Sequence, residues 1–401
     1  MNTKELLKPT FWKVVSVIIV TMGLISTYLR FSQGLGATTN LKDSVPWGLW
    51  IGFDFIGVGL AAAGFTIAAT VHIFNIHKYE PLVRPAILTA FLGYSVVVCL
   101  LLVDLGRPEN FWHPLVMWNI HSVMFEITWC IICYSTVLLL EFAPVILEKF
   151  NLKAPIKFLK IISIPVVIAG VLFSTLHQSS FGSLYLIVPG KLHPLWYSSL
   201  LPIHFYVSCI AAGLSMIIFE SYLIARGCTK EHGFCNTGLK LNILSGAAFV
   251  VWIALIVGLL LKIYDFVNND KLIYLTIPSM ETSLFYLEII LGTLIPIYLL
   301  SYKKFRADKK WLYIISILVI SGLILNRLNV SITGLVASSG INYFPSFDEI
   351  SITMMLVVLA IFAFRLIAKN FSVFISEESE VPESNTSANK SRQIILSEQY
   401  D

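Results

Sequence analysis

The sequence has 401 residues, of which 57% are hydrophobic and 13% charged, with a formal net charge of +4. A soluble globular protein is about 45–50% apolar and about 25% charged, so this composition excludes an ordinary soluble domain and predicts a polytopic membrane protein. The small positive charge does not indicate nucleic-acid binding, because the cations lie in short connections between apolar runs.

Ten apolar segments are each long enough to span a bilayer. They run approximately over residues 11–30, 50–73, 85–104, 120–143, 158–177, 201–225, 243–264, 282–301, 311–328 and 348–369. We therefore expect an all-α membrane protein, a polytopic bundle of ten transmembrane helices within residues 1–370. The tail over 371–401 is rich in Ser, Glu and Asn, and we expect it to be disordered.

The distribution of Lys and Arg predicts the orientation of this bundle. The two termini and the even-numbered connections hold 21 of the 28 Lys and Arg residues, and the other five connections hold the remaining 7. Cytoplasmic loops carry the excess of positive charge in membrane proteins. We therefore expect both termini in the cytoplasm.

The run from Pro46 to Gly57 places a carboxylate inside an apolar segment. Asp54 would lie about 10 Å along the helix from Trp47. A carboxylate at that depth costs several kcal/mol unless it is paired, so Asp54 should face the protein interior or water. With Trp47 and Trp50 it would form an aromatic pocket for a lipid-soluble ligand. In the alternative interpretation the tryptophans form only an interfacial belt.

Four further polar residues lie in predicted spans at different depths. Glu126 is expected in the outer third, Tyr94 near the middle, and Arg84 and Glu220 toward the cytoplasmic side. Desolvation disfavours the ionised form of a buried carboxyl, which suits Glu126 to take and release a proton. Together the four could form a proton route. Each also has a structural alternative, such as interfacial snorkelling for Glu220.

The histidines and cysteines give no compelling cofactor site. A bis-His haem b needs two histidines on facing helices at matching depth. His121 and His204 could match, but histidines near the outer edge equally suit a quinone carbonyl. The six cysteines form no haem-attachment or iron–sulfur run. We expect no haem, iron–sulfur cluster or metal here, and a quinone site formed by Trp47, Trp50, Asp54, His121 and His177, with His177 at the outer end of the fifth span.

Several short motifs resemble those of the NrfD/PsrC family, the membrane subunits of polysulfide reductase-type complexes. They are 46–54, 79–85, 93–95, 125–126, 141–144 and 177–183. The closer resemblance is to the HybB-type membrane subunit of periplasmic nickel–iron hydrogenases, and it includes 193–196, 219–220 and 343–345. The likeness extends from about Trp12 to about residue 370. The tail after 370 departs from the family.

The resemblance implies a quinone-reactive anchor without a bound cofactor, which exchanges menaquinone or ubiquinone near the outer face. A periplasmic ferredoxin-like iron–sulfur subunit would dock on that face and connect it to a catalytic subunit, a hydrogenase or a molybdoenzyme. The chain alone would not act on the primary substrate. The residues that match functional positions of the family are Asp54, Arg84, Tyr94, Glu126, His177 and Glu220.

Other assignments stay open at this point. The chain could be an NrfD-type anchor of a molybdoenzyme or multihaem cytochrome complex. Buried carboxylates also occur in secondary transporters, where matched broken helices mark the two halves. A passive anchor without quinone or proton chemistry is the third alternative.

Overall fold

The computed structural model describes residues 11–227, 241–371 and 373. Apart from one isolated β-bridge between Lys42 and Val45, the regular structure in this part of the chain is helical. Ten of its helical segments are long and apolar enough to cross a membrane. The predicted all-α architecture with ten spans is therefore confirmed. Nearly all of the tail that we expect to be disordered lies outside the described residues.

Apart from the ends of the fifth and ninth spans, the spans begin and end close to the predicted positions. In chain order they are α2 (Phe11–Gln33), α4 with α5 (Leu49–Ala61, Ala63–His72), η1 with α6 (His77–Leu82, Val83–Asp104), α8 (Val123–Lys149), α10 (Ser163–Leu186), α11 (Leu201–Gly227), α12 (Leu241–Asn268), α13 with η6 and α14 (Met280–Ile289, Ile290–Leu294, Ile295–Ser301), α16 with η7 and α17 (Lys309–Leu328, Asn329–Thr333, Gly334–Ser339) and α18 (Phe347–Asn370). The short helices between them are α3 (Leu35–Thr38), η2 (Pro108–Asn110), α7 (His113–Val116), α9 (Lys153–Ile161), η5 (Lys271–Leu275) and α15 (Lys303–Arg306). Helices dominate because a backbone in hydrocarbon must satisfy its own hydrogen bonds.

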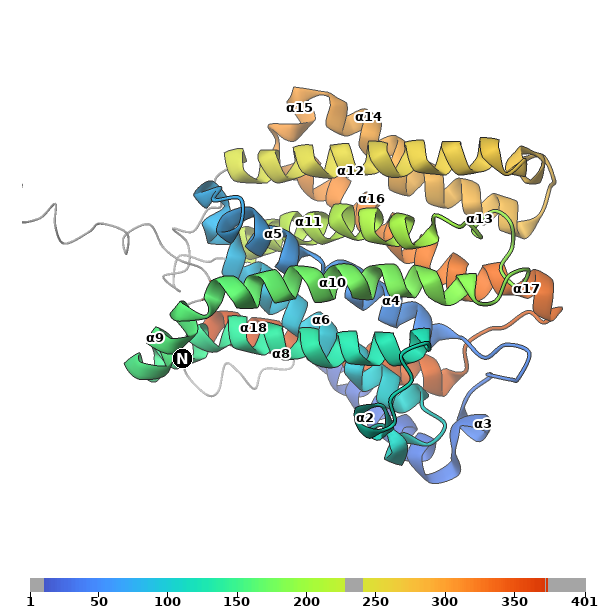
Figure 1. The fold of residues 1–401 in the computed structure, drawn as a ribbon, viewed down its shortest axis with the longest axis horizontal. Helices are drawn as coiled ribbons and strands as arrows, with labels where there is room; N and C mark the ends of the chain where they lie inside the picture. The colour runs from blue at the N-terminus through green and yellow to red at the C-terminus, as the bar shows by residue number, and fades with distance from the viewer. Residues whose placement is uncertain (1–10, 228–240, 372, 374–401) are drawn as a thin grey trace, which may run out of the picture.

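The spans pack as two groups of four with a helix pair beside them. The first bundle consists of α4–α5, α6, α8 and α10, and the second bundle of α11, α12, α13–α14 and α16–α17. Helices α10 and α11 join the two bundles, as do α4 and α16. The pair α2 and α18 packs against α6 and α4. The long helices run roughly parallel to one another (Figure 1).

The two ends of the bundle are named here by a residue at each. The Trp47 end holds the connections 34–48, 105–122, 187–200, 269–279 and 340–346, and the Lys303 end holds 73–76, 150–162 and 302–308. In Figure 1, α3 and α17 lie at the Trp47 end on the right, and α9 lies at the Lys303 end on the left.

Polar side chains fix where several helices begin. Ser122 accepts a hydrogen bond from the Phe125 N–H at the start of α8, and Asp308 accepts one from the Lys310 N–H at the start of α16. Ser346 starts α18. Each such cap satisfies a backbone donor that the helix leaves free, and is worth about 1 kcal/mol.

Two spans of the second bundle each contain a π-helical turn. These turns are η6 in the eighth span and η7 in the ninth. Gly292 in η6 faces Gly322 in α16 so closely that a Cβ on either residue would overlap the other backbone. Glycines therefore permit the close approach of these helices, as in other membrane bundles. Single π-helical turns occur frequently at functional sites.

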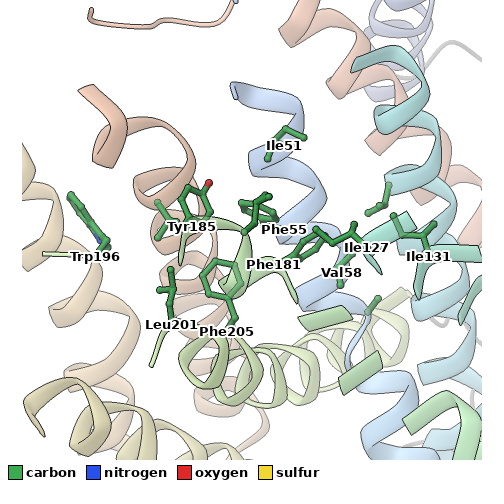
Figure 2. Close-up of a cluster of buried hydrophobic side chains, with 14 of the residues drawn as sticks. Ile51, Phe55, Val58, Ile127, Ile131, Phe181, Tyr185, Trp196, Leu201 and Phe205 are labelled. Atoms are coloured by element: carbon green, nitrogen blue, oxygen red, sulfur yellow. The ribbon is translucent and has the colours of Figure 1, made fainter. Parts of the chain in front are cut away.

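A cluster of buried apolar side chains crosses from one bundle to the other. Phe55 of α4 lies between Phe181 of α10 and Phe205 of α11, with ring centroids 4.6 and 5.6 Å apart. Figure 2 shows this group, with Ile127 and Ile131 on one side and Leu201 and Trp196 on the other. The two bundles therefore share one core.

The fifth span is longer than the sequence predicts. It extends to Leu186, so His177 and Gln178 lie inside α10 and are buried, whereas we expected them at its outer end. The stretch after His177 reads as polar, but its serines bond within the helix. Ser180 Oγ donates to the Leu176 carbonyl at 2.7 Å, and Ser183 Oγ donates to the Ser179 carbonyl at 3.2 Å. Serines that bond back in this way are compatible with a helix in an apolar environment.

Candidate functional site

The start of α4, which carries Asp54, is tied to α18 by hydrogen bonds. The Leu49 N–H donates to the Tyr343 phenol oxygen at 3.1 Å, and that phenol donates to the Glu349 carboxylate. Trp50 Nε1 donates to the Glu349 carbonyl at 3.3 Å. Burial, and secondly the bond to Glu349, raises the pKa of Tyr343, so its phenol stays a donor. Trp50 is 1% exposed, so it is buried in the contact between α4 and α18.

Asp54 is buried without a hydrogen-bond partner. Its side chain is 1% exposed, and neither carboxyl oxygen has a donor within the described part of the chain. A buried polar group without a partner costs about 1–3 kcal/mol, and more if it is charged. Asp54 therefore faces the protein interior, which is one of the two placements expected from the sequence.

Tyr94 and His177 form the central pair of the first bundle. The Tyr94 phenol and His177 Nδ1 lie 2.8 Å apart, and both residues are fully buried. The other ring nitrogen, His177 Nε2, has no partner among the described residues. The next residue, Gln178, fixes α10 in place because its Nε2 donates to the Val58 carbonyl at 2.8 Å. The structure thus brings together two predicted site residues that lie 83 positions apart.

A row of aromatic rings leads from His177 to the Trp47 end. The ring centroids of His177 and Phe181 are 4.5 Å apart, and those of Phe181 and Phe55 are 4.6 Å apart. Phe55 lies 6.0 Å from Tyr185, which lies 5.2 Å from Trp47. Figure 2 shows Phe55, Phe181 and Tyr185 side by side. Trp47 is therefore part of an aromatic wall, as its position in the sequence predicts.

Glu126 differs from the prediction, because it is exposed rather than buried. It lies in the first turn of α8, and its Oε1 lies 2.7 Å from Ser180 Oγ of α10, within hydrogen-bonding distance. Ser180 is one helical turn from His177. His121 is exposed in the connection before α8, and its N–H donates to Asn119 Oδ1 at 3.3 Å. The structure therefore joins Glu126 to His177 through α10, but it does not bring His121 to Asp54.

Arg84 and Glu220 each have a partner that the sequence does not indicate. Arg84 donates to both oxygens of Glu148 at 2.8 Å, near the Lys303 end. Glu220 accepts from Thr89 Oγ1 at 2.6 Å. Thr89 lies five residues from Arg84 and five from Tyr94, so the steps along α6 are about 7.5 Å each. The four predicted route residues are thus arranged in series, with gaps that water molecules would have to bridge.

Glu349 is the main site residue that sequence reasoning missed. Residues 343–345 serve as a motif of the resemblance, and the sequence places Glu349 at the start of the last span, without a role. The detectable signal is the pair Ser346 and Glu349, a capping box, which the structure contains. No sequence signal identifies Thr89, Glu148 or Ser180, because a hydroxyl or carboxylate in a helix gives no information about its partner on another helix.

A second polar cluster lies in the second bundle. The sequence places Glu288 in the eighth span and Arg327 in the ninth, where a direct pair or two interfacial groups would be the simplest arrangements. Instead both are buried and Asn326 lies between them, donating to Glu288 Oε1 at 2.9 Å and accepting from Arg327 Nη1 at 2.6 Å. Within the described ranges, no group of three or more His, Cys, Asp or Glu side chains is arranged to hold a metal ion.

Comparisons with known proteins agree with this architecture. The family model "Polysulphide reductase, NrfD" matches residues 37–338. The "Probable Ni/Fe-hydrogenase 2 b-type cytochrome subunit" of Escherichia coli is 32% identical over 88% of this chain and 89% of its own length. The "Menaquinone reductase, integral membrane subunit" of Nitratidesulfovibrio vulgaris is 26% identical over 93% and 94% of the two chains.

A further relative, a selenate reductase subunit of Mesobacillus selenatarsenatis, is 27% identical over 67% of this chain and 68% of its own length. These relatives carry different names, but the family match covers most of the chain and both bundles. The chain therefore belongs to the NrfD family of polysulphide reductase-type integral membrane subunits.

Proposed function

We propose that this protein is the quinone-reactive membrane subunit of a respiratory oxidoreductase complex, of the HybB type found with hydrogenases. It passes electrons between a periplasmic iron–sulfur subunit and the quinone pool of the membrane. The printed names of the hydrogenase and menaquinone reductase relatives support this proposal. The structural observations that carry it are the buried carboxyl oxygens of Asp54 and the buried Nε2 of His177, which have no partner among the described residues, and the aromatic ring that packs against His177.

The site has the groups that quinone reduction needs. A quinone accepts hydrogen bonds at two carbonyl oxygens, and its reduction to quinol takes up two electrons and two protons. His177 Nε2 and a protonated Asp54 carboxyl can each donate a hydrogen bond and then a proton. Phe181 and Trp47 provide apolar contact surface for the ring and its isoprenoid chain.

Protons for this reaction would come along the series of polar residues from the Lys303 end. Glu220 and Thr89 precede Tyr94 and His177 along the bundle. Glu126 lies at its surface beside Ser180 and is the last donor before the quinone. If electrons enter from the outside, only protons drawn from the cytoplasm separate charge, each worth about 2.3 kcal/mol per 100 mV.

The charge distribution supports an orientation with both termini in the cytoplasm of a bacterial inner membrane. The Trp47 end then faces the periplasm, where the iron–sulfur subunit docks. A reporter enzyme that is active only in the cytoplasm should be active when fused to the C-terminus, and one that is active only in the periplasm should not. Periplasmic activity of that fusion would reverse the assignment of the two ends.

We also propose that the subunit works without haem, although the Escherichia coli relative has the name of a b-type cytochrome. A bis-His haem needs a second histidine across from the first, and among the described residues the ring neighbours of His177, in the centre of the first bundle, are Tyr94 and Phe181. An absorption spectrum of the purified complex with stoichiometric b-type bands from this subunit would overturn the proposal.

The test of the proposed function is the variant Asp54→Ala in the purified complex. We expect quinone-linked turnover to fall at least about 100-fold, because the site loses a hydrogen-bond donor and a proton donor. Activity of the catalytic subunit with a soluble dye should stay unchanged. Asp43→Ala, at an exposed position in the connection before α4, is the matched control. Normal quinone turnover in an assembled Asp54→Ala complex would contradict the proposal and favour a passive anchor.

A further inference from the structure

The second bundle contains a cavity that the proposed quinone chemistry does not use. Its volume is about 110 Å³, and it lies between α11, α12, α13–η6 and α16. Most of its lining is apolar, but His204, Lys262, Glu288 and Asn326 line it from four different helices. Charged side chains in the membrane-spanning part of a protein are costly, and they mark functional sites by default.

Glu288 is the centre of this polar lining and is fully bonded. Its Oε1 accepts from Lys262 Nζ at 3.1 Å and from Asn326 Nδ2 at 2.9 Å. Its Oε2 accepts from Trp196 Nε1 at 2.9 Å and from Asn329 Nδ2 at 3.1 Å. Glu288 is 4% exposed. Four donors hold this carboxylate in place, and one of them is the ammonium of Lys262, its ion-pair partner.

Three other charged or titratable groups lie near this ion pair. His204 faces the cavity from α11, and Asp265 faces it from α12. Asp265 is closed off by its own cation, since Lys271 Nζ donates to its Oδ2 at 2.6 Å. Arg327 of α16 lies behind Asn326 and stacks on a phenylalanine ring. Both members of the ion pair of Glu288 and Lys262 therefore line the cavity, whereas Lys271, the partner of Asp265, does not.

The same cluster reaches the first bundle through Arg327. Its guanidinium carbon lies 3.6 Å from the centroid of the Phe205 ring, and Phe205 packs against Phe55. Arg327 is buried and forms no direct ion pair with a carboxylate within the described residues. Its positive charge therefore lies between Asn326, which contacts Glu288, and the ring of Phe205, which packs against Phe55.

The cavity has the size and the polar partners to hold water. A buried water needs about 10–15 Å³ of such space and two to four polar partners, so this cavity has room for several. The lining offers an ammonium, a carboxylate, an imidazole and an amide as partners. The π-helical turn η6, which follows Glu288, contributes Gly292 to the same lining.

We infer that this cavity is a hydrated proton-binding site in which Glu288 accepts the proton and Lys262 is the cation that its ion pair releases. The inference rests on the proposed function and names a second site for coupling quinone reduction to proton movement. In the loading step, an O–H bond of a protonated cavity water breaks and an O–H bond forms on Glu288. The carboxyl becomes neutral, and the Lys262 ammonium turns to cavity water. The reverse step returns the proton, and no electron is transferred at this site.

Arg327 provides the physical link between the two sites. An electron that arrives on the quinone adds negative charge to the first bundle, where a low dielectric transmits its field further than water would. Arg327 contacts Phe205, which belongs to the core shared with the first bundle, and Asn326, which bonds Glu288. A change in its interactions would alter the strength of the network around Glu288.

The first experiment measures protons moved per electron with the complex in proteoliposomes. Glu288→Gln and Lys262→Met should each lower this ratio about twofold or more, while turnover with an uncoupler stays within about twofold of the wild type. Glu281→Gln, on the same helix outside the cavity lining, should change neither value. If both variants keep the wild-type number of protons per electron at normal turnover, this inference is overturned but the proposed function is not. A wild-type complex without quinone turnover would contradict the proposed function itself.

The second experiment tests hydration and needs no turnover. In the full complex, Ala254→Cys places a thiol in the cavity lining, and Ile253→Cys places one on the exposed apolar face of α12. A small charged methanethiosulfonate reagent should modify Cys at 254 about tenfold faster or more than at 253, since thiols react as thiolates that need water. Equal, slow modification rates at the two positions would overturn the inference. This experiment remains decisive if Glu288→Gln fails to assemble, because it does not use that variant.

Discussion

The two bundles differ in how one buried carboxylate of each is satisfied. In the first bundle, both oxygens of Asp54 have no partner within the described residues, nor has Nε2 of His177, whose ring packs against Phe181. In the second bundle, Glu288 has four donors and lies at a polar cavity. Because unpaired buried groups are costly, a fold keeps them where a bound molecule completes their hydrogen bonds. The comparison thus separates a ligand site from a site that holds charge.

The histidines of the two bundles give the strongest way to break this comparison. His177→Phe removes the free Nε2 and the partner of Tyr94, and we expect quinone turnover to fall at least about 100-fold. His204→Phe, in the lining of the cavity of the second bundle, should leave quinone turnover within about threefold of the wild type because it removes no proton donor to the quinone. Steady-state assays with quinone and with a soluble dye measure both effects. The reverse order of the two losses would place the quinone in the second bundle.

The carboxylates of the first bundle sharpen the comparison with a smaller effect. Glu220→Gln and Glu126→Gln keep a polar side chain beside Thr89 and Ser180 but cannot carry a proton. We expect each to lower coupled turnover about tenfold, or about 1.4 kcal/mol in activation free energy, without loss of assembly. Glu109→Gln, exposed at the Trp47 end, is the control. Wild-type coupling in both variants would leave these carboxylates with a structural role only.

The smallest expected effect concerns the support of the quinone site. Tyr343→Phe leaves the Leu49 N–H and the Glu349 carboxylate without a phenol partner, and should lower the free energy of unfolding by about 1–3 kcal/mol. Because burial raises the pKa of Tyr343, this contribution is present below the ordinary tyrosine pKa of about 10 and declines above it. Thermal unfolding of the purified complex across pH measures it. Tyr286→Phe, which removes one exposed hydrogen bond, should cost less, and an equal cost would contradict this account.

The fold could be predicted from hydropathy because each span needs a long apolar run. The ten spans follow from that rule, and Tyr94 lies at mid-helix as expected. The end of the fifth span was wrong because its serines bond inside α10. A hydropathy pattern does not distinguish a serine that leaves a helix from one that bonds back within it.

The site could be predicted in part, since Asp54 and His177 are polar residues in apolar spans. Their arrangement depends on which faces of α4, α6 and α10 meet, and a single sequence does not specify this. The burial of Glu126 was therefore predicted wrongly, and neither Glu148 nor Thr89 was found. The cavity at Glu288 depends on four helices and two facing glycines, which are separate signals along the chain.

The most direct test of the central claim is to locate the quinone itself. A photoreactive quinone analogue is cross-linked to the purified complex, and the labelled peptides are identified by mass spectrometry, with excess natural quinone as competitor. We predict competed labels on the peptides that contain Trp47 to Phe55 and His177 to Tyr185. Competed labels confined to α12 and α13, around Lys262 and Glu288, would contradict the assignment of the quinone to the first bundle.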